Sequence, residues 1–413
     1  GGCLRNFEPD YYILIFAIIQ AKNTGKVRAR MNRPDTILRK LNDAGFGAYF
    51  VGGCVRDLLL GREIHDWDIT TAALPEQTMR VFPHCIPTGI QHGTLTVIIG
   101  DTQAEVTTFR CDGAYHDGRH PESVRFVPRL EEDLARRDLT INAMAMDEAG
   151  KITDLFGGRE DLKRKIIRCV GEPDKRFQED ALRMLRALRF SAQLGFAIEE
   201  ETLAAIGRNA ALCRQLSRER VQSEAEKTLL SDRPEVFGTM LSLGLLSACG
   251  AEGERDLTPL CTVPAVLEAR WAMAKVLLPR LPLEQFRLPA KLTRLANAAA
   301  AAYKECYTRQ ALKQLLADEG FDTARVCAML SGQEALLEEI LDSGECVSLK
   351  TLAVTGRDFP ELCGKDVGRM LRALFLHVLL HPEDNDRQTL LRLAAAGMFE
   401  KSDVDGDKHV GDV

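Results

Sequence analysis

The feature that most constrains the fold is a short apolar run that ends in two adjacent glycines and is followed by two aspartates. The apolar run has the length of a buried strand, and Gly52-Gly53 separates it from a helical pattern. Asp66 and Asp68 follow, with a tryptophan between them. Residues two apart on a strand face the same side, so we expect both carboxylates on one face and the tryptophan on the other. This order of elements predicts a mixed α/β unit.

The same residues have the chemistry of a site for divalent ions and phosphate. Asp66 and Asp68 offer the oxygen ligands that Mg²⁺ prefers, and paired ions of this kind activate an attacking hydroxyl and stabilise charge on a transferring phosphate. Gly53 lacks a Cβ, so a triphosphate can approach the backbone, and Arg56 at the next helix start can bind a phosphate bidentately. Alone, an acidic pair at a strand end is more typical of a solvated sheet edge.

The hydrophobic pattern changes along the chain. Strand-like runs at 94–99, 104–109 and 124–127 give way, beyond residue 154, to helical periodicity that includes 179–194 and 199–209. A chain of 413 residues is too long for one core, so we expect several packed units. The predicted fold class is α+β, a head with a small mixed sheet followed by an all-helical neck, body and tail. The expected boundaries are 1–30 for an N-terminal extension, 31–150 for the head, 151–230 for the neck, 231–345 for the body, 346–400 for the tail and 401–413 for a flexible end.

Charge and cysteine content limit the partners. A formal net charge of −6 argues against nucleic-acid binding through a generally basic surface, so any RNA contact must be local. The 12 cysteines form no CxxC pair and do not cluster with histidines, which favours free thiols in the cytoplasm over disulfides or structural zinc. The apolar run at 11–19 is shorter than the roughly 20 residues of a spanning helix, so no membrane partner is expected.

The glycine turn and the two aspartates, in this order and spacing, resemble the palm of the DNA polymerase β nucleotidyltransferase superfamily. The resemblance implies a third carboxylate on a neighbouring strand. Glu105, in the run Ala-Glu-Val-Thr-Thr, stands where that residue is expected and is our third catalytic candidate beside Asp66 and Asp68. The alternative is an ordinary surface residue of a strand.

A second polar segment, Arg-Arg-Asp-Leu-Thr-Ile-Asn-Ala-Met at 136–144, resembles an element of the tRNA nucleotidyltransferase and poly(A) polymerase family. In that family the RRDxxxNA element holds ribose and phosphate. The resemblance implies that Arg137 supplies charge to the triphosphate and that Asp138 and Asn142 bind sugar hydroxyls. The alternative is a helix start with Asp138 as its N-cap, which leaves the two preceding arginines unexplained.

The segment 179–190 reads as a helix whose leucines are buried. Asp180, Arg183, Arg186 and Arg189 recur every three residues on an adjoining polar stripe. Cytosine and adenine both present an exocyclic amine beside a ring-nitrogen acceptor, so a carboxylate and a guanidinium would accept either base. Uracil and guanine would leave polar groups unpaired, at roughly 1–3 kcal/mol each. By itself the pattern is also that of an i, i+3 salt bridge on a solvated helix.

This EDxxRxxRxxRF pattern resembles the amino-acid template of class II CCA-adding enzymes. The resemblance implies template-independent addition of CCA to the 3′ end of tRNA from CTP and ATP, with release of pyrophosphate and with Mg²⁺ as cofactor. Asp180 and Arg183 would select the base, and Arg186 and Arg189 would lie near the triphosphate or support the template. The segments 88–94 and 112–121 also resemble this branch, and 355–358 and 364–368 resemble its tail.

Three alternatives stay open. A poly(A) polymerase is one, a transferase that adds only A or only CC is another, and a helical RNA-binding protein with an inactive head is the third. The sequence also leaves open whether the chain forms a homodimer. The predicted location is cytoplasmic.

Overall fold

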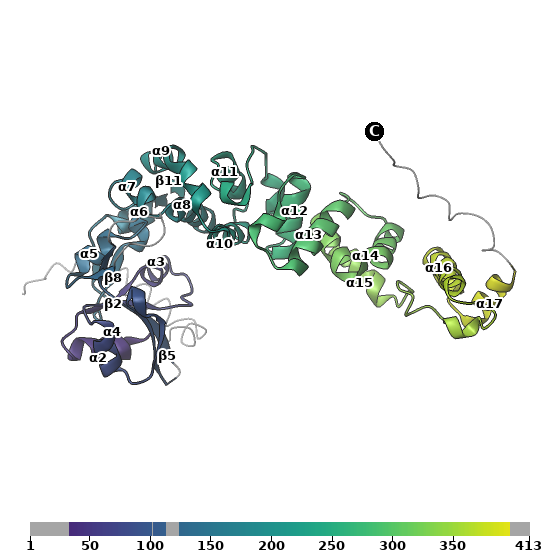
Figure 1. The fold of residues 1–413 in the computed structure, drawn as a ribbon, viewed down its shortest axis with the longest axis horizontal. Coiled ribbons are helices and arrows are strands. Elements are labelled where there is room, and N and C mark those ends of the chain that lie inside the picture. Colours follow the sequence, from purple (N-terminus) through teal and green to yellow (C-terminus); the bar gives the residue numbers. More distant parts are fainter. Residues whose placement is uncertain (1–32, 101, 113–123, 397–413) are drawn as a thin grey trace, which may run out of the picture. The chain divides into compact units, whose positions relative to one another are not determined.

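The computed structural model describes residues 33–100, 102–112 and 124–396, and it divides the chain into two compact units, Gly1–Glu254 and Arg255–Val413 (Figure 1). The predicted N-terminal extension, the predicted flexible C-terminal end and the last four residues of the predicted tail lie outside the described residues. Within the described part, no helix is long and apolar enough to cross a membrane. The expected subdivision into head, neck, body and tail stays a prediction.

The first unit is built on a mixed sheet of seven strands in the order β3-β4-β5-β2-β1-β8-β9. All neighbouring pairs are antiparallel except β2 and β5, which are parallel. The strands are β1 Ala48–Val51, β2 Asp68–Thr71, β3 Cys85–Gly89, β4 Thr94–Ile99, β5 Thr102–Thr108, β8 Met144–Met146 and β9 Ile152–Asp154. Two small two-stranded sheets pair β6 Arg110–Asp112 with β7 Val124–Phe126 and β10 Ile166–Ile167 with β11 Ala197–Ile198.

Helices cover this sheet and continue beyond it. The α-helices of the unit are α2 Asp35–Asp43, α3 Gly53–Leu59, α4 Pro75–Val81, α5 Leu130–Ala135, α6 Gly158–Arg164, α7 Pro173–Glu179, α8 Leu182–Leu194, α9 Glu200–Asn209, α10 Arg218–Leu229 and α11 Val236–Ser242. Short 3-10 turns are η1 Ile90–His92, η2 Thr140–Asn142, η3 Ala210–Gln215 and η4 Ser247–Cys249. In α2, Ile37, Leu38 and Leu41 are fully buried.

A buried apolar cluster holds the strands of the head against a helix. Val51, Phe109, Leu134 and Ala145 belong to one buried cluster, which joins the central strands to α5. The mixed α/β head is therefore confirmed. The strand predicted at 104–109 begins earlier than predicted, because β5 starts at Thr102. The short strands β3, β8 and β9 were not predicted.

The predicted helix from residue 179 is wrong in one respect, because the chain forms two helices there. α7 ends at Glu179, Asp180 has an extended backbone with φ −146° and ψ 105°, and α8 begins at Leu182. The Asp180 side chain accepts a hydrogen bond from the Leu182 backbone N–H at 3.0 Å. A local bond of this kind competes with the helical one, so the aspartate ends the helix pattern instead of continuing it.

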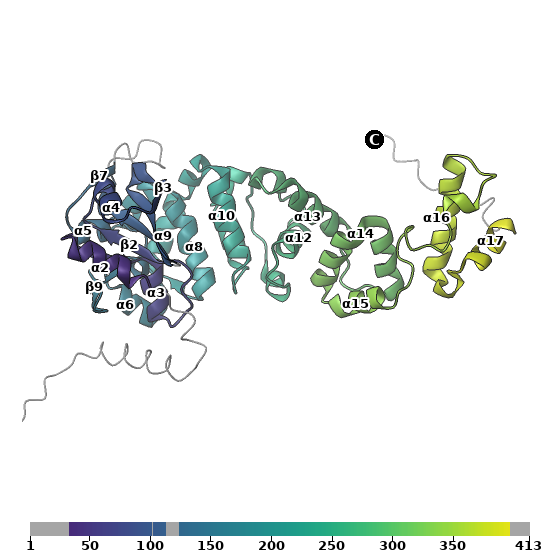
Figure 2. The same ribbon diagram turned by 90° about the horizontal axis from the view of Figure 1, so that it is seen from below.

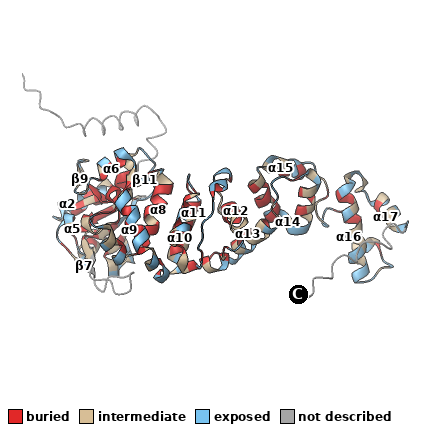
Figure 3. Ribbon diagram, turned by 90° about the horizontal axis from the view of Figure 1, so that it is seen from above, coloured by how far each residue is buried: buried red, intermediate tan, exposed pale blue. Residues whose placement is uncertain are grey.

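Beyond the break, α8 packs beside α10 (Figure 2). Most residues of α8 are buried (Figure 3). They include Arg183 and Arg189 as well as Leu182, Leu185 and Leu188. The predicted polar stripe therefore faces protein along much of its length.

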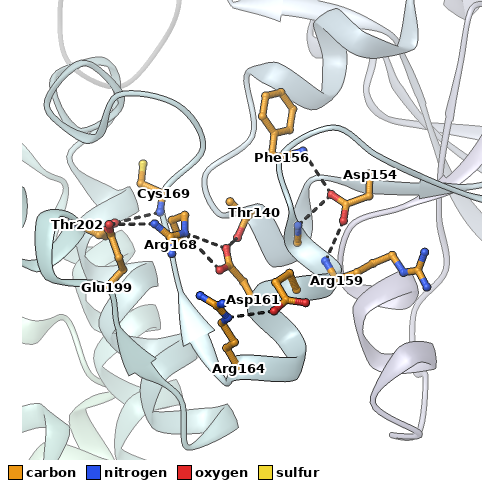
Figure 4. A network of polar contacts seen from close by, with 12 residues as sticks. Thr140, Asp154, Phe156, Arg159, Asp161, Arg164, Arg168, Cys169, Glu199 and Thr202 are labelled. Carbon is orange, nitrogen blue, oxygen red and sulfur yellow. Dashed lines mark hydrogen bonds and ion pairs between the residues drawn. The ribbon is translucent and has the colours of Figure 1, made fainter.

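A polar network links the segment at 139–142 to the helices that follow it (Figure 4). Asp161 of α6 accepts hydrogen bonds from the Thr140 hydroxyl at 2.7 Å and from Arg168 at 3.1 Å. Arg168 also donates to Glu199 at 3.0 Å, and Glu199 accepts from the Thr202 hydroxyl at 2.6 Å. These bonds fix η2 against α6, the strand β10 region and α9.

The second unit is helical throughout its described part, as predicted. It comprises α12 Leu267–Leu277, α13 Ala290–Ala302, α14 Arg309–Ser331, which is interrupted at Gly320, α15 Glu334–Asp342, α16 Lys365–Leu380 and α17 Arg387–Ala395. Short turns are η5 Thr258–Thr262, η6 Leu283–Phe286, η7 Gly356–Asp358 and η8 Pro382–Asp384. Trp271 packs on Phe286 with ring centres 5.0 Å apart, and a second cluster joins α16 and α17 around Leu374 and Leu390.

Candidate active site

Two of the three acidic residues lie on adjacent strands, Asp68 at the start of β2 and Glu105 on β5. Asp66 lies in the segment just before β2, so the prediction that it shares a strand with Asp68 is wrong. The parallel register of β2 and β5 pairs Asp68 with Glu105, and the Glu105 backbone N–H donates to the Trp67 carbonyl at 3.1 Å. Trp67 is buried and its ring lies 4.9 Å from that of Phe50. The tryptophan therefore belongs to the core, while Asp66 and Glu105 are exposed and Asp68 is half-buried.

Negative charge converges on Asp68. The pKa of its carboxyl is raised to about 6, mainly by burial; the charge of Arg137 lowers the pKa, and the charges of Glu105 and Asp66 raise it. A cation beside these acids would relieve their repulsion. Among the described residues, no three His, Cys, Asp or Glu side chains are grouped as a metal site. Mg²⁺ does not require such a group, because it binds through one or two carboxylates, substrate phosphates and water.

The glycine turn lies next to these acids. Gly52 has φ +79°, and a Cβ there would lie 3.1 Å from Nη1 of Arg137 and 3.8 Å from Oδ2 of Asp68. Any side chain at this position is therefore strained and would press on the arginine. Gly53 is different, because a Cβ there would meet Arg56 only at 3.6 Å, an ordinary contact. The packing of the protein therefore does not by itself require glycine at 53.

Arg56 and Asn142 are bonded to each other in this site. Nη1 of Arg56 donates to Oδ1 of Asn142 at 2.7 Å, and its other edge donates to both oxygens of Asp57. A phosphate that binds this edge must therefore displace Asp57. Arg137 donates to Asp133 at 3.1 Å, and Asp133 is fully buried. Both partner carboxylates were missed by the sequence reasoning, although Asp133 stands four residues before Arg137, at helical spacing.

Asp138 is buried at the centre of the next group. Its carboxylate accepts from Nε of Arg186 at 2.6 Å and from the Leu139 backbone N–H at 2.8 Å, and Asn142 lies 3.5 Å away. Burial alone would raise the pKa of Asp138, but the charge and hydrogen bond of Arg186 lower it to about 2. The bond to Arg186 joins the segment at 136–144 to α8, so two motifs that are far apart in sequence meet here.

The remaining residues of the predicted base-selecting stripe have carboxylate or guanidinium partners. Arg183 pairs with Glu179 at 2.5 Å, and Arg189 pairs with Glu224 of α10 at 2.5 Å. Asp180, between α7 and α8, pairs with Arg220 at 2.7 Å. The spacing of four residues between Glu179 and Arg183 was visible in the sequence, whereas no local signal indicates the partners on α10.

The segment 112–121, which resembles the CCA-adding branch, lies outside the described residues from 113 onward. The roles of the predicted site residues stay predictions. The geometry nevertheless brings Asp66, Asp68 and Glu105 to one place on the sheet, and it connects Asp138 to Arg186.

The mixed sheet with acids on adjacent strands, the glycine turn that leads into α3, and the helical remainder define a nucleotidyltransferase with a polymerase β-type head. Two family models match, the poly A polymerase head domain over residues 48–168 and the probable RNA and SrmB-binding site of polymerase A over 195–249. A CCA-adding enzyme from Geobacillus stearothermophilus is 41% identical over 379 residues, which cover 86% of this chain and 94% of that protein. The chain belongs to the CCA-adding enzyme family.

Two further comparisons agree with this placement. A CCA-adding enzyme from Lactobacillus delbrueckii subsp. bulgaricus is 50% identical over 248 residues, which span 59% of this chain and 63% of that protein. The crystal structure of the Bacillus stearothermophilus CCA-adding enzyme in complex with CTP superposes with a TM-score of 0.76 at 37% identity. That match covers 89% of this chain and 97% of the other.

Proposed function

We propose that this chain adds cytidine, cytidine and adenosine in turn to the 3′ end of tRNA, from CTP and ATP and without a nucleic-acid template. The observation that carries the proposal is the match to a CCA-adding enzyme along 94% of that protein's length. The solved relative in complex with CTP supports the choice of nucleotide. A poly(A) polymerase or a partial transferase is the alternative within the class.

In the proposed reaction the RNA 3′-hydroxyl attacks the α-phosphate of the nucleotide and pyrophosphate leaves. Asp66 and Asp68 would hold Mg²⁺, which supplies charge stabilisation and lowers the pKa of the attacking hydroxyl when bound. Glu105 would accept the hydroxyl proton or assist its removal. The adjacency of Asp68 and Glu105 on β2 and β5 supports this assignment.

The triphosphate and ribose would lie between the glycine turn and α8. Gly53 leaves room at the backbone, and Arg137 lies between that turn and Asp68, where it can neutralise phosphate charge. Arg186 is the accessible arginine of α8, with a third of its side chain exposed at 33%. Asp138 and Asn142 would orient the sugar.

Base selection would rest on Asp180 and Arg183. Asp180 accepts the exocyclic amine hydrogen and Arg183 donates to the ring nitrogen, so cytosine and adenine fit the same pair of groups. The salt bridges to Arg220 and Glu179 hold the two side chains in place before a base arrives. Uracil or guanine would present a carbonyl oxygen to Asp180 and an N–H to Arg183, so polar groups of the base would stay unpaired, at roughly 1–3 kcal/mol each.

The test supplies single nucleotides to tRNAs that end before CCA, after the first C, or after the second C. We expect C on the first two substrates, A on the third, and no transfer when Mg²⁺ is chelated. Continued addition of A to any RNA end would indicate a poly(A) polymerase. Binding of tRNA without consumption of nucleotide would overturn the proposal in favour of an RNA-binding protein.

The free cysteines of the described part fit a reducing compartment, so we infer a cytoplasmic location.

A further inference from the structure

One aromatic ring in the first unit lies against three guanidinium groups. Phe190 belongs to α8 and is buried, with 6% of its surface exposed. The guanidinium carbons of Arg56, Arg186 and Arg189 lie 4.9, 5.4 and 3.8 Å from the centre of its ring. All three fall within the distance of about 6 Å at which the negative face of a ring attracts a cation.

The three arginines come from two different parts of the fold. Arg56 belongs to α3, the helix that follows the glycine turn, whereas Arg186 and Arg189 stand on α8 beside Phe190 itself. The ring is therefore a contact between the helix proposed to bind phosphate and the helix next to the base-selecting residues.

The aromatic ring is not needed to neutralise the three arginines, because each arginine pairs with a carboxylate of its own. Arg56 pairs with Asp57 at 2.8 Å, Arg186 with Asp138 at 2.6 Å and Arg189 with Glu224 at 2.5 Å. These pairs balance the three positive charges. The ring gives the three arginines, which repel one another, a shared surface of fixed position. This surface restricts where their guanidinium groups lie.

We propose that Phe190 is a positioning residue that aligns these arginines for the triphosphate that CTP and ATP have in common. The inference rests on the proposed function. An aliphatic side chain would fill the space but would lack the negative ring face. Loss of that face should weaken both nucleotides equally. The choice of base should not change, because it depends on Asp180 and Arg183.

The test replaces Phe190 with phenylalanine analogues that carry increasing numbers of ring fluorines, which withdraw charge from the ring face with little change in size. We expect KM for CTP and for ATP to rise stepwise along the series, by about threefold to thirtyfold at the fully fluorinated ring. The ratio of C to U incorporation and the thermal midpoint should stay close to those of the unsubstituted protein. Tyrosine at this position, as F190Y, retains a ring face and should restore most of the affinity.

The matched control is the same series at Phe286, a fully buried ring of the second unit that packs on Trp271. Fluorination there should leave both KM values unchanged. A flat KM along the Phe190 series would overturn the inference, as would a rise in KM that comes with loss of base choice and of thermal stability. If the unsubstituted protein adds neither C nor A to tRNA, the proposed function fails instead, before Phe190 is tested.

Discussion

Replacing Asp138 with asparagine removes a buried charge from the site while nearly preserving the shape of the side chain. Asp138 is held at 2.6 Å by Nε of Arg186 and at 2.8 Å by the Leu139 N–H, and its pKa is about 2 instead of the ordinary 3.8. Each pKa unit corresponds to about 1.4 kcal/mol, so the charged form stabilises the fold by about 2 kcal/mol. The NH2 group of an asparagine would also face a donor in either orientation, Nε of Arg186 or the Leu139 N–H.

The assay is urea unfolding of the wild type and of Asp138→Asn between pH 7 and the lowest pH at which both fold. The folded-state pKa lies below the unfolded one, so the extra stability of the wild type is fully present above pH 4. It should disappear as the pH falls from 3.8 toward 2. Arg186→Met serves as the partner variant, and the double variant should cost less than the sum of the two. A difference that is independent of pH, or fully additive effects, would refute the reasoning.

Three further predictions address the other parts of the molecule. Asp180→Ala should raise incorporation of UTP relative to CTP by about fivefold to 150-fold while metal-dependent transfer of C persists, and single-nucleotide incorporation at matched concentrations measures this. Asp68→Asn should reduce nucleotide transfer by at least about a thousandfold. In the presence of chelator it should not lower the melting temperature, because the charge of Asp68 is buried near two other acids. A lower melting temperature of the variant in chelator would contradict the argument. Glu345→Gln should destabilise the second unit at pH 7 but not near pH 2, because Lys313 and Arg309 lower the pKa of Glu345 to about 2. Urea unfolding followed by Trp271 fluorescence at the two pH values tests this prediction.

Local signals were sufficient for much of the fold. The strand before Gly52, the helix after it and the amphipathic α2 follow from patterns that lie within a few residues of each other. The break at Asp180 was missed because periodicity alone continues through it. Its cause is an aspartate side chain that bonds to the backbone two residues later, together with a partner, Arg220, forty positions away.

The candidate site shows the same division. The spacing of Asp66 and Asp68 predicted one shared strand, but β2 begins at Asp68 and Asp66 precedes it. Glu105 was predicted from the family resemblance. The partners that hold the site together, Asp133, Glu224 and the ring of Phe190, were not assigned any role. Glu224 contacts Arg189, and Phe190 contacts Arg56, across elements that are distant in sequence, and a single sequence contains no record of such contacts. Asp133 is different, because it pairs with Arg137 four residues later, at a spacing that the sequence does show.

The parallel pairing of β2 with β5 makes the arrangement of the acids all-or-none. Successive side chains of a strand point to opposite faces, so a slip of one residue between these strands would turn Glu105 away from Asp68. A single inserted or deleted residue near the start of β5 would thus abolish the proposed nucleotide transfer while leaving a sheet with the same strand order. The length of the β4–β5 hairpin is consequently constrained by the proposed chemistry.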